Sequence, residues 1–365
     1  MAPMLPDGRR LGAHLGLGHG MVTAADRATE IGATAIQIFS DNPTTWRRRA
    51  EPSPEVPAFR ERLATAAIAP LSIHASYLIN LAGSDLTYHE RSVVLLAAEL
   101  RSARRFGAAL VNVHIGSHGG AGIEPGIVRL VNAVRQALDA ENDSDSLDES
   151  NDSLAPPAMI TLENSSGNGF GLGVDLDELT AIADALDAAG VPRHRIGFCL
   201  DTAHAWGAGH DLSDPMATDS LLEGFDRRIG LDRLPLIHLN DSKSELGSRV
   251  DRHEHVGAGQ IGEAGLAHLL RHPRLAGATY ILETPGMDEG YDTINLARAI
   301  ALARGEPIAA LPPGAFALRS SRSRAATPVD PPIEPDAADP GVFVPDAVPV
   351  AKRSSAISSR GEAGS

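Results

Sequence analysis

Three neighbouring segments decide the fold of this chain: MITLEN at residues 159–164, LDELTAIADALDAA at 176–189 and IGFCLD at 196–201. The first and the last are short and apolar, which is typical of strands buried in a parallel sheet. In the middle segment the apolar residues recur at helical intervals, at Leu176, Leu179, Ile182 and Leu186. A strand, a helix and a second strand in this order predict a βαβ unit.

The same alternation continues along the chain in both directions. Further short apolar runs lie at 11–17, 35–40, 70–75, 110–115, 235–241 and 278–284. Helix-like segments separate them, at 21–33, 56–68, 89–106, 126–140, 220–229, 264–272 and 291–303. Eight strand–helix units predict an α/β protein with a closed (β/α)8 TIM barrel, with strands inside and helices outside. An open, doubly wound sheet is the alternative, and it suits eight units less well.

Two segments fall outside this pattern. Residues 142–157 are rich in Asp, Ser, Asn and Pro, and they predict a flexible acidic insert in a catalytic domain spanning 1–305. The insert follows a helix and precedes a strand, so we expect it on the barrel face opposite the active site. Residues 306–365 are rich in Pro, Ala and Ser and predict a disordered tail.

The composition indicates the compartment and the kind of core. Apolar residues make up 43% of the chain and aromatic residues only 4%, so the core must be mainly aliphatic. The single cysteine, Cys199, lies in an apolar run, and we expect a small buried side chain in a protein of the reducing cytoplasm. There is no stretch of ~18 consecutive apolar residues and no signal-peptide pattern, so we expect no membrane partner.

The formal charge of −15 argues at first against a nucleic-acid partner. However, seven acids and no bases lie within 139–152, and the tail from Glu306 carries a net −1, which leaves −7 for the rest of the chain. The charge therefore neither excludes DNA nor supports it. The basic residues Arg47, Arg48 and Arg49 are a candidate phosphate contact, or alternatively the solvated start of a helix.

Polar residues of the types that bind metals follow the predicted strands. A TIM barrel gathers its active site at the carboxyl ends of its strands. There, beside His14, the sequence places His74, His114, Glu163, Asp201, His204, His238, Asp251, His253 and Glu283. One such histidine is more often a hydrogen-bonded core residue, and one such aspartate more often caps a helix. Together, however, they would be costly to bury without cations. Mixed His and carboxylate ligands without thiolate suit Zn²⁺, and also Mn²⁺ or Fe²⁺, and their number suits two or three ions.

The motifs around these residues form an ordered set: IHASYLIN at 73–80, VHIGSH at 113–118, LEN at 162–164, LDTAH at 200–204, HLNDSK at 238–243, GSRVDRH at 247–253 and LET at 282–284. In order, spacing and residue type, the chain from 11 to 304 resembles endonuclease IV. The insert and the tail have no counterpart in that family.

This resemblance implies a TIM barrel with three zinc ions per chain, held respectively by His74, His114 and Glu163; by Glu163, Asp201, His238 and Glu283; and by His204, Asp251 and His253. Glu163 and Glu283 are also the expected catalytic carboxylates. Three divalent ions would bring the charge of −7 on the rest of the chain close to neutrality. His255 is not a family ligand, and we expect it at the surface. His118 and His210 are likewise left out of the site.

The resemblance also implies contacts to DNA. In the family, the loop after the second strand enters the minor groove of the duplex. Here that loop reads NPTTW at 42–46, with Thr44 where the family has an arginine. Asn42, Trp46 and Tyr77 are the expected DNA contacts, and a core aromatic residue is the alternative for Tyr77.

We therefore expect a zinc-dependent deoxyribonuclease that acts as a monomer on double-stranded DNA containing abasic sites. It would hydrolyse the phosphodiester on the 5′ side of the lesion and leave a 3′-hydroxyl and a 5′-deoxyribose phosphate. The main alternative is a xylose isomerase-like sugar isomerase or epimerase, which needs one divalent ion held by four of these residues: Glu163, Asp201, His238 and Glu283. Five further candidate ligands discriminate between the two, because a single ion gives them no role: His74, His114, His204, Asp251 and His253.

Two non-enzymatic interpretations are weaker. A DNA-binding module without catalysis would not explain a complete set of ligands. A purely structural metal site would close its coordination and would lie away from the active-site end of a barrel.

Overall fold

Eight parallel strands form a closed barrel in the computed structural model, which describes residues 5, 8–49, 53–145 and 155–317. The strands are β1 (Arg10–His14), β2 (Ala35–Phe39), β3 (Leu71–His74), β4 (Leu110–His114), β5 (Met159–Glu163), β6 (Ile196–Asp201), β7 (Leu236–His238) and β10 (Thr279–Leu282). Each strand pairs with its neighbours in chain order, and β10 closes the ring against β1. The predicted TIM barrel is thus confirmed.

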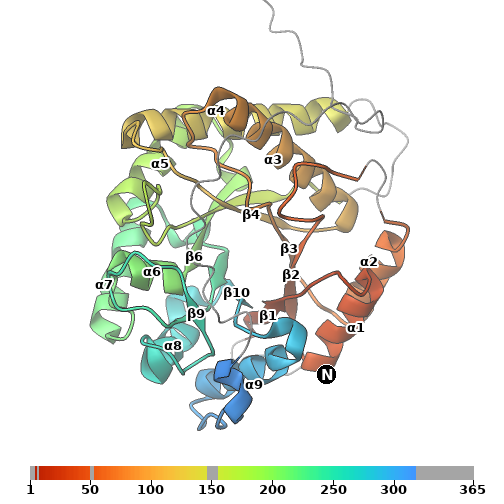
Figure 1. Cartoon of the computed structure of the whole chain (residues 1–365), viewed down its shortest axis with the longest axis vertical. Coiled ribbons are helices and arrows are strands. Elements are labelled where there is room, and N and C mark those ends of the chain that lie inside the picture. Colours follow the sequence, from red (N-terminus) through yellow and green to blue (C-terminus); the bar gives the residue numbers. More distant parts are fainter. Residues whose placement is uncertain (1–4, 6–7, 50–52, 146–154, 318–365) are drawn as a thin grey trace, which may run out of the picture. The chain divides into compact units, whose positions relative to one another are not determined.

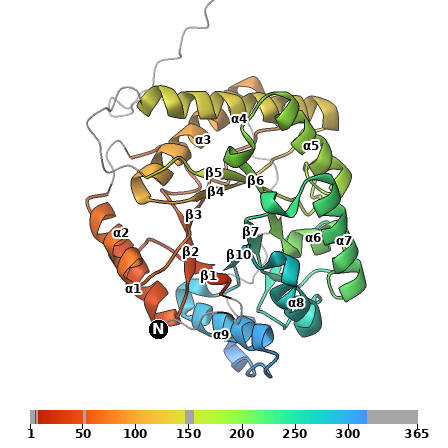
Figure 2. The ribbon, with the colours of Figure 1, turned by 180° about the vertical axis from the view of Figure 1, so that it is seen from behind.

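Helices surround the barrel (Figures 1 and 2). They are α1 (Met21–Ile31), α2 (Val56–Thr65), α3 (Leu86–Phe106), α4 (Ile123–Asp145), α5 (Leu176–Ala188), α7 (Pro215–Arg228), α8 (Gly262–Arg271) and α9 (Tyr291–Arg304). Leu179, Ile182 and Leu186 of α5 are buried, as the spacing predicts. Each helix buries one face on the outside of the sheet, where the large core cluster of the protein lies.

Side chains inside the barrel change from apolar to polar along the strands. Successive residues of a strand point to opposite faces, so every second residue faces the barrel axis. At the amino end, a small separate cluster of Ala35, Leu110, Cys199, Leu236 and Ile281 fills the interior. Two residues further along lie buried polar side chains: Gln37, Asn112, Thr161, Asp201 and His238. The barrel therefore has an apolar floor and a polar upper layer.

One glycine permits the strands to close at the start of the ring. Gly12 lies in β1 beside Ala35 of β2, and a Cβ atom at Gly12 would lie 1.6 Å from the Ala35 carbonyl oxygen. Any larger residue at this position would push the two strands apart. Because β1 also pairs with β10, that separation would open the ring.

The sequence patterns did not predict one short helix and one small pair of strands. A short helix, α6 (Thr202–Ala208), follows β6 directly, and the side chain of Asp201 caps it by accepting a hydrogen bond from the His204 amide at 2.8 Å. A small antiparallel pair, β8 (Asp241–Ser242) and β9 (His253–Glu254), lies in the connection after β7. Both are too short to produce a recognisable period in the sequence.

The predicted boundaries of the insert and the tail need correction. Helix α4 continues to Asp145, so the first residues of the predicted insert at 142–157 are helical, and 146–154 lie outside the described residues. The prediction of a disordered tail from 306 is wrong for its first part. Residues 306–317 are described, Ala315 is buried, and Ile308 packs against the core. Residues 318–365 lie outside the described part of the chain.

Cys199 is a buried free cysteine, as expected, and burial raises the pKa of its thiol to about 12. Among the described residues, every helix is too short or too polar to cross a membrane.

Phe198 tests the packing between the sheet and the helices. Its side chain is 1% exposed, and its ring lies 5.8 Å from that of Phe225 on α7. We expect Phe198→Ala to lower the free energy of unfolding by about 3–5 kcal/mol, because a large buried ring leaves a cavity. Phe170→Ala, at a ring that is 56% exposed, should change it by less than about 0.5 kcal/mol. Urea denaturation of the two variants checks this, and equal stabilities would contradict it.

Candidate metal centre

The candidate ligands gather where the strands end. Five strands end in a candidate ligand: β3 in His74, β4 in His114, β5 in Glu163, β6 in Asp201 and β7 in His238. Glu283 follows β10 directly. The register places His114 opposite Glu163, and Asp201 opposite His238. We call this end of the barrel the mouth. Because one register aligns all these strands, side chains from distant parts of the sequence meet there.

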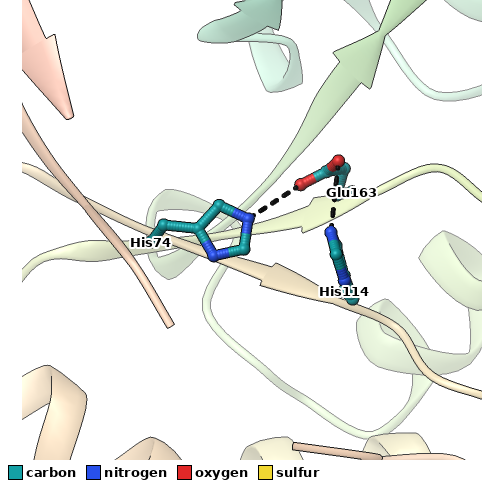
Figure 3. A group of neighbouring side chains, drawn as sticks. All are labelled: His74, His114 and Glu163. Carbon is teal, nitrogen blue, oxygen red and sulfur yellow. Dashed lines mark ion pairs between the residues drawn. The ribbon is translucent and has the colours of Figure 1, made fainter. Parts of the chain in front are cut away.

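The first group contains His74, His114 and Glu163 (Figure 3). His74 Nε2 lies 3.5 Å from Glu163 Oε2, and His114 Nε2 lies 3.4 Å from Glu163 Oε1. Glu163 and His74 are buried, whereas the side chain of His114 is 40% exposed. The two imidazoles therefore face the same carboxylate from different sides.

The second group is centred on His238. Its Nδ1 atom lies 3.3 Å from Glu283 Oε2, 3.6 Å from Glu163 Oε2 and 3.9 Å from Asp201 Oδ2. One ring nitrogen thus faces three carboxylates, and Glu163 faces both this group and the first. Such an arrangement could hold a metal ion next to that of the first group.

The third group joins α6 to the β8–β9 connection. His204 Nε2 and His253 Nε2 each lie 3.2 Å from a carboxylate oxygen of Asp251. His253 Nε2 also lies 3.6 Å from Asp201 Oδ2, so Asp201 can contribute to this group as well. Asp251 is half-exposed, and its group is the one nearest to solvent.

Hydrogen bonds orient four of the histidines. One ring nitrogen of each lies close to a fixed oxygen: His74 Nδ1 is 2.8 Å from the Ala75 carbonyl and His204 Nδ1 is 3.0 Å from that of Asn164. His253 Nδ1 is likewise 2.8 Å from the Glu283 carbonyl. For His238 the acceptor is Gln37 Oε1, 3.1 Å from Nε2. A ring nitrogen that donates in this way leaves the other with a lone pair directed at the carboxylates, which is how metal-binding histidines are usually held.

Unsatisfied atoms in the mouth fit metal ligation. Within the described part of the chain, Glu163 Oε1, His238 Nδ1 and His253 Nε2 are buried and have no hydrogen-bond partner. Buried polar atoms normally have a partner, so three of them facing one region need an explanation. All three belong to residue types that bind Zn²⁺, and a divalent ion would satisfy them.

The buried carboxylates of the centre depend on nearby positive charge. Burial by itself would raise the pKa of Glu163, but His114 and His238 hold it well below its usual value. Burial opposes protonation of His253, yet Asp251 and Asp201 raise its pKa to about 10. Without cations, these carboxylates can be balanced only by protonated imidazoles. A bound metal ion displaces such protons, which couples metal affinity to pH.

Gln37 contacts two of the candidate ligands, and the sequence patterns did not predict it. It is fully buried on β2, and its amide nitrogen donates to Glu283 Oε1 at 2.7 Å while its oxygen faces His238. His14, which the sequence placed near this end of the barrel, lies 3.2 Å from the Gln37 amide through its Nδ1 atom. A glutamine in an apolar run gives no sign of such a role. Only its position two residues beyond the apolar floor could have indicated it.

The prediction that His255 lies at the surface is wrong. His255 is fully buried: its Nδ1 atom lies 2.9 Å from the Asn295 amide, and its Nε2 atom lies 3.0 Å from the Ala315 carbonyl. Residues 306–317 cover this side chain, and nothing in the local sequence indicates that contact. His118 and His210 belong to none of the three groups.

The predicted DNA contacts lie on two loops next to the mouth. Asn42 is exposed and its Oδ1 accepts two hydrogen bonds from Thr44. The indole of Trp46 packs edge-on against Tyr88, 5.1 Å between ring centroids. Tyr77 is 51% exposed, with its ring 5.6 Å from that of His74, so it is not a core aromatic residue.

The basic residues 47–49 do not begin a helix, because α2 starts only at Val56. Arg48 pairs with the buried Glu99 at 2.8 Å and holds the loop to α3. Arg47 and Arg49 are exposed on the same loop.

The fold and the donor set define a TIM-barrel protein with a candidate metal centre at the carboxyl ends of its strands. The profile of the xylose isomerase-like TIM-barrel family matches residues 25–304. The probable endonuclease 4 of Methanoculleus marisnigri is 38% identical over 293 residues, which cover 80% of this chain and 98% of that protein. That of Halothermothrix orenii is also 38% identical, over 79% of this chain and 99% of its own length.

The crystal structure of endonuclease IV from Thermus thermophilus matches with a TM-score of 0.68 at 36% identity, over 81% of this chain and 99% of that one. The chain belongs to the endonuclease IV family. A D-tagatose 3-epimerase-like protein, with a TM-score of 0.56 and 15% identity, shares the fold alone.

Gln37→Leu tests whether the buried amide positions the ligands. The variant keeps the volume but leaves His238 and Glu283 without their common partner. We expect zinc affinity to fall about 10- to 100-fold, the usual effect of losing an outer partner of a ligand. Competition with a chelating dye measures it, with the exposed Gln136→Leu as the matched control. Equal affinities in the two variants would show that Gln37 has no positioning role.

Proposed function

We propose that this protein is a zinc-dependent DNA repair endonuclease that hydrolyses the phosphodiester on the 5′ side of abasic sites. The products would be a 3′-hydroxyl and a 5′-deoxyribose phosphate. One observation carries the proposal: nine metal-ligand side chains converge at the mouth in three adjoining groups, far more than one ion needs. Membership of the endonuclease IV family supports the same reaction class.

In this proposal three zinc ions are held as the groups suggest. His74, His114 and Glu163 would hold one, and Glu163 would also contribute to the second, together with Asp201, His238 and Glu283. His204, Asp251 and His253 would hold the third. The half-exposed Asp251 and His114 lie on the solvent side, where a phosphate group could approach.

The chemistry follows from the ligands. Zinc ions bound here would supply hydroxide at neutral pH and would neutralise charge on phosphate oxygens and on a leaving oxygen. The protein's own residues contribute the geometry. Glu163 and Glu283, which we propose as the catalytic carboxylates, are held by hydrogen bonds from Asn112 and Gln37 respectively. A centre whose ligands are fixed beforehand needs little rearrangement as charge develops in the transition state.

Two loops beside the mouth could form a contact surface for a nucleic-acid substrate. The loop with Asn42 and Trp46 is tied to the one with Tyr77, because the Pro43 carbonyl accepts hydrogen bonds from the Tyr77 amide at 3.2 Å and the Ser76 hydroxyl at 2.7 Å. The two loops can therefore act as one contact surface. An abasic nucleotide costs little to turn out of the helix, because it has no base to unstack.

A sugar isomerase or epimerase is the second candidate. The single ion that such an enzyme uses could be held by four residues alone: Glu163, Asp201, His238 and Glu283. The first and third groups argue against it, because they would then place unneeded histidines around Glu163 and Asp251. The epimerase-like protein shares only the fold with this chain, whereas the probable endonuclease 4 proteins are 38% identical to it.

Cleavage of a duplex that carries one tetrahydrofuran abasic analogue tests the proposed function. This analogue cannot undergo β-elimination, so a cut reports hydrolysis. We expect the wild type to cut on the 5′ side of the analogue. The cleavage rate of His238→Ala should be at least about 100-fold lower, because this variant lacks the imidazole that faces three of the candidate carboxylate ligands.

The matched control for this assay is His194→Ala, which removes an exposed histidine remote from the nine ligands. It should cut as the wild type does. If folded, zinc-loaded wild type leaves the duplex intact, the endonuclease proposal fails, and epimerase activity on ketohexoses becomes the next assay.

Tyr77 gives a separate test of the DNA contact. Base–aromatic stacking contributes about 1–3 kcal/mol, so Tyr77→Ala should weaken binding to the abasic duplex by about 5- to 150-fold. Tyr77→Phe keeps the ring and should bind like the wild type. Fluorescence anisotropy on an inactive His238→Ala background measures both variants. Unchanged binding by Tyr77→Ala would exclude a DNA-contacting role.

A further inference from the structure

A second cluster of metal-ligand side chains lies away from the mouth, between the outer helices α7 and α8. It consists of Asp219 on α7, His268 on α8 and His272 at the end of α8. None of these residues belongs to the nine ligands, and none lies at the end of a barrel strand. We propose that Asp219, His268 and His272 form a further site for a divalent transition-metal ion, with zinc as the ion to test.

The spacing of His268 and His272 places two of the three proposed ligands side by side. Residues four apart lie on the same face of a helix, so His268 and His272 point the same way. Their ring centroids are 5.5 Å apart with an interplanar angle of 73°. Two imidazoles at this spacing on one helix face are a common way to bind zinc, copper or nickel.

Asp219 supplies the third ligand from the neighbouring helix. Its Oδ1 atom lies 2.6 Å from His268 Nε2 and 3.3 Å from His272 Nε2. Zinc–ligand bonds of about 2.0–2.1 Å in a tetrahedron separate the donors by roughly 3.3–3.4 Å. The distance to His272 already matches, and the distance to His268 would need to lengthen by roughly 0.7 Å.

The surroundings suit a site that holds two helices together. The side chain of His272 is 9% exposed, that of His268 26% and that of Asp219 55%, so the donors run from a buried base to an open side. Water can complete the coordination from that open side. An ion here would connect α7 to α8, which otherwise meet through few residues. Burial and the charge of Arg274 both lower the pKa of His272, but Arg274 is itself paired with the carboxylate of Asp226 on α7.

Zinc content and thermal unfolding test the site directly. Wild type, His268→Gln and Asp219→Asn are equilibrated with excess zinc, separated from free zinc by gel filtration, and measured by mass spectrometry of the metal. We expect each variant to hold one zinc per chain fewer than the wild type. Excess zinc should raise the unfolding temperature of the wild type more than that of either variant.

The matched control is Glu223→Gln, which changes an exposed acidic residue on α7, the helix that carries Asp219. This variant should keep the wild-type zinc content. Because all these positions lie outside the mouth, cleavage of the abasic duplex should stay within about twofold of wild type, so this test is independent of the proposed function. Equal zinc content in the wild type and both variants would overturn the site and leave an ordinary His–Asp ion pair. Asp219 is exposed, so Asp219→Asn keeps the test valid if His268→Gln misfolds.

Discussion

Buried negative charge at the mouth of the barrel is the constraint on which the rest of the site depends. Glu163 and Asp201 are almost completely buried, with Glu283 nearby. Burying carboxylates costs several kcal/mol each unless opposite charge is close. The protein surrounds these carboxylates with histidines, and hydrogen bonds direct one nitrogen of four of them toward the carboxylates. Such a centre is built to be completed by cations, and protons are only a partial substitute.

The barrel makes this concentration of polar groups possible. Its apolar floor and its outer helices supply the hydrophobic burial that stabilises the fold. The polar upper layer then needs only to be satisfied internally. Gln37, Asn112 and Asn240 do so, because each amide binds one of the ligands. The same residues thereby fix the ligand geometry, so stability and the proposed chemistry depend on one network.

The eight strands and the nine candidate ligands could be predicted because both depend on local patterns. Strands appear as apolar runs, and six of the candidate ligands end such a run or follow it directly. The other three, His204, Asp251 and His253, lie in the connections after β6 and β7. The missed features depend on contacts that are distant in sequence or on very short elements. Gln37 acts through His238, 201 residues away, and His255 is covered by Ala315. Helix α6 has only seven residues and is positioned by its cap, Asp201. Composition suggested a disordered tail, but it could not reveal that Ile308 packs against the core and that Ala315 is buried.

We propose that the mouth holds several metal ions, which would distinguish it from the single-ion centre of a sugar isomerase. Anomalous diffraction at the zinc absorption edge, from crystals of the zinc-loaded protein, tests this most directly. A peak between α7 and α8 would belong to the proposed site of Asp219, His268 and His272, and it has no bearing on the number of ions at the mouth. We expect three peaks at the mouth, one within each group of ligands. A single peak near His238, or none at the mouth, would contradict it.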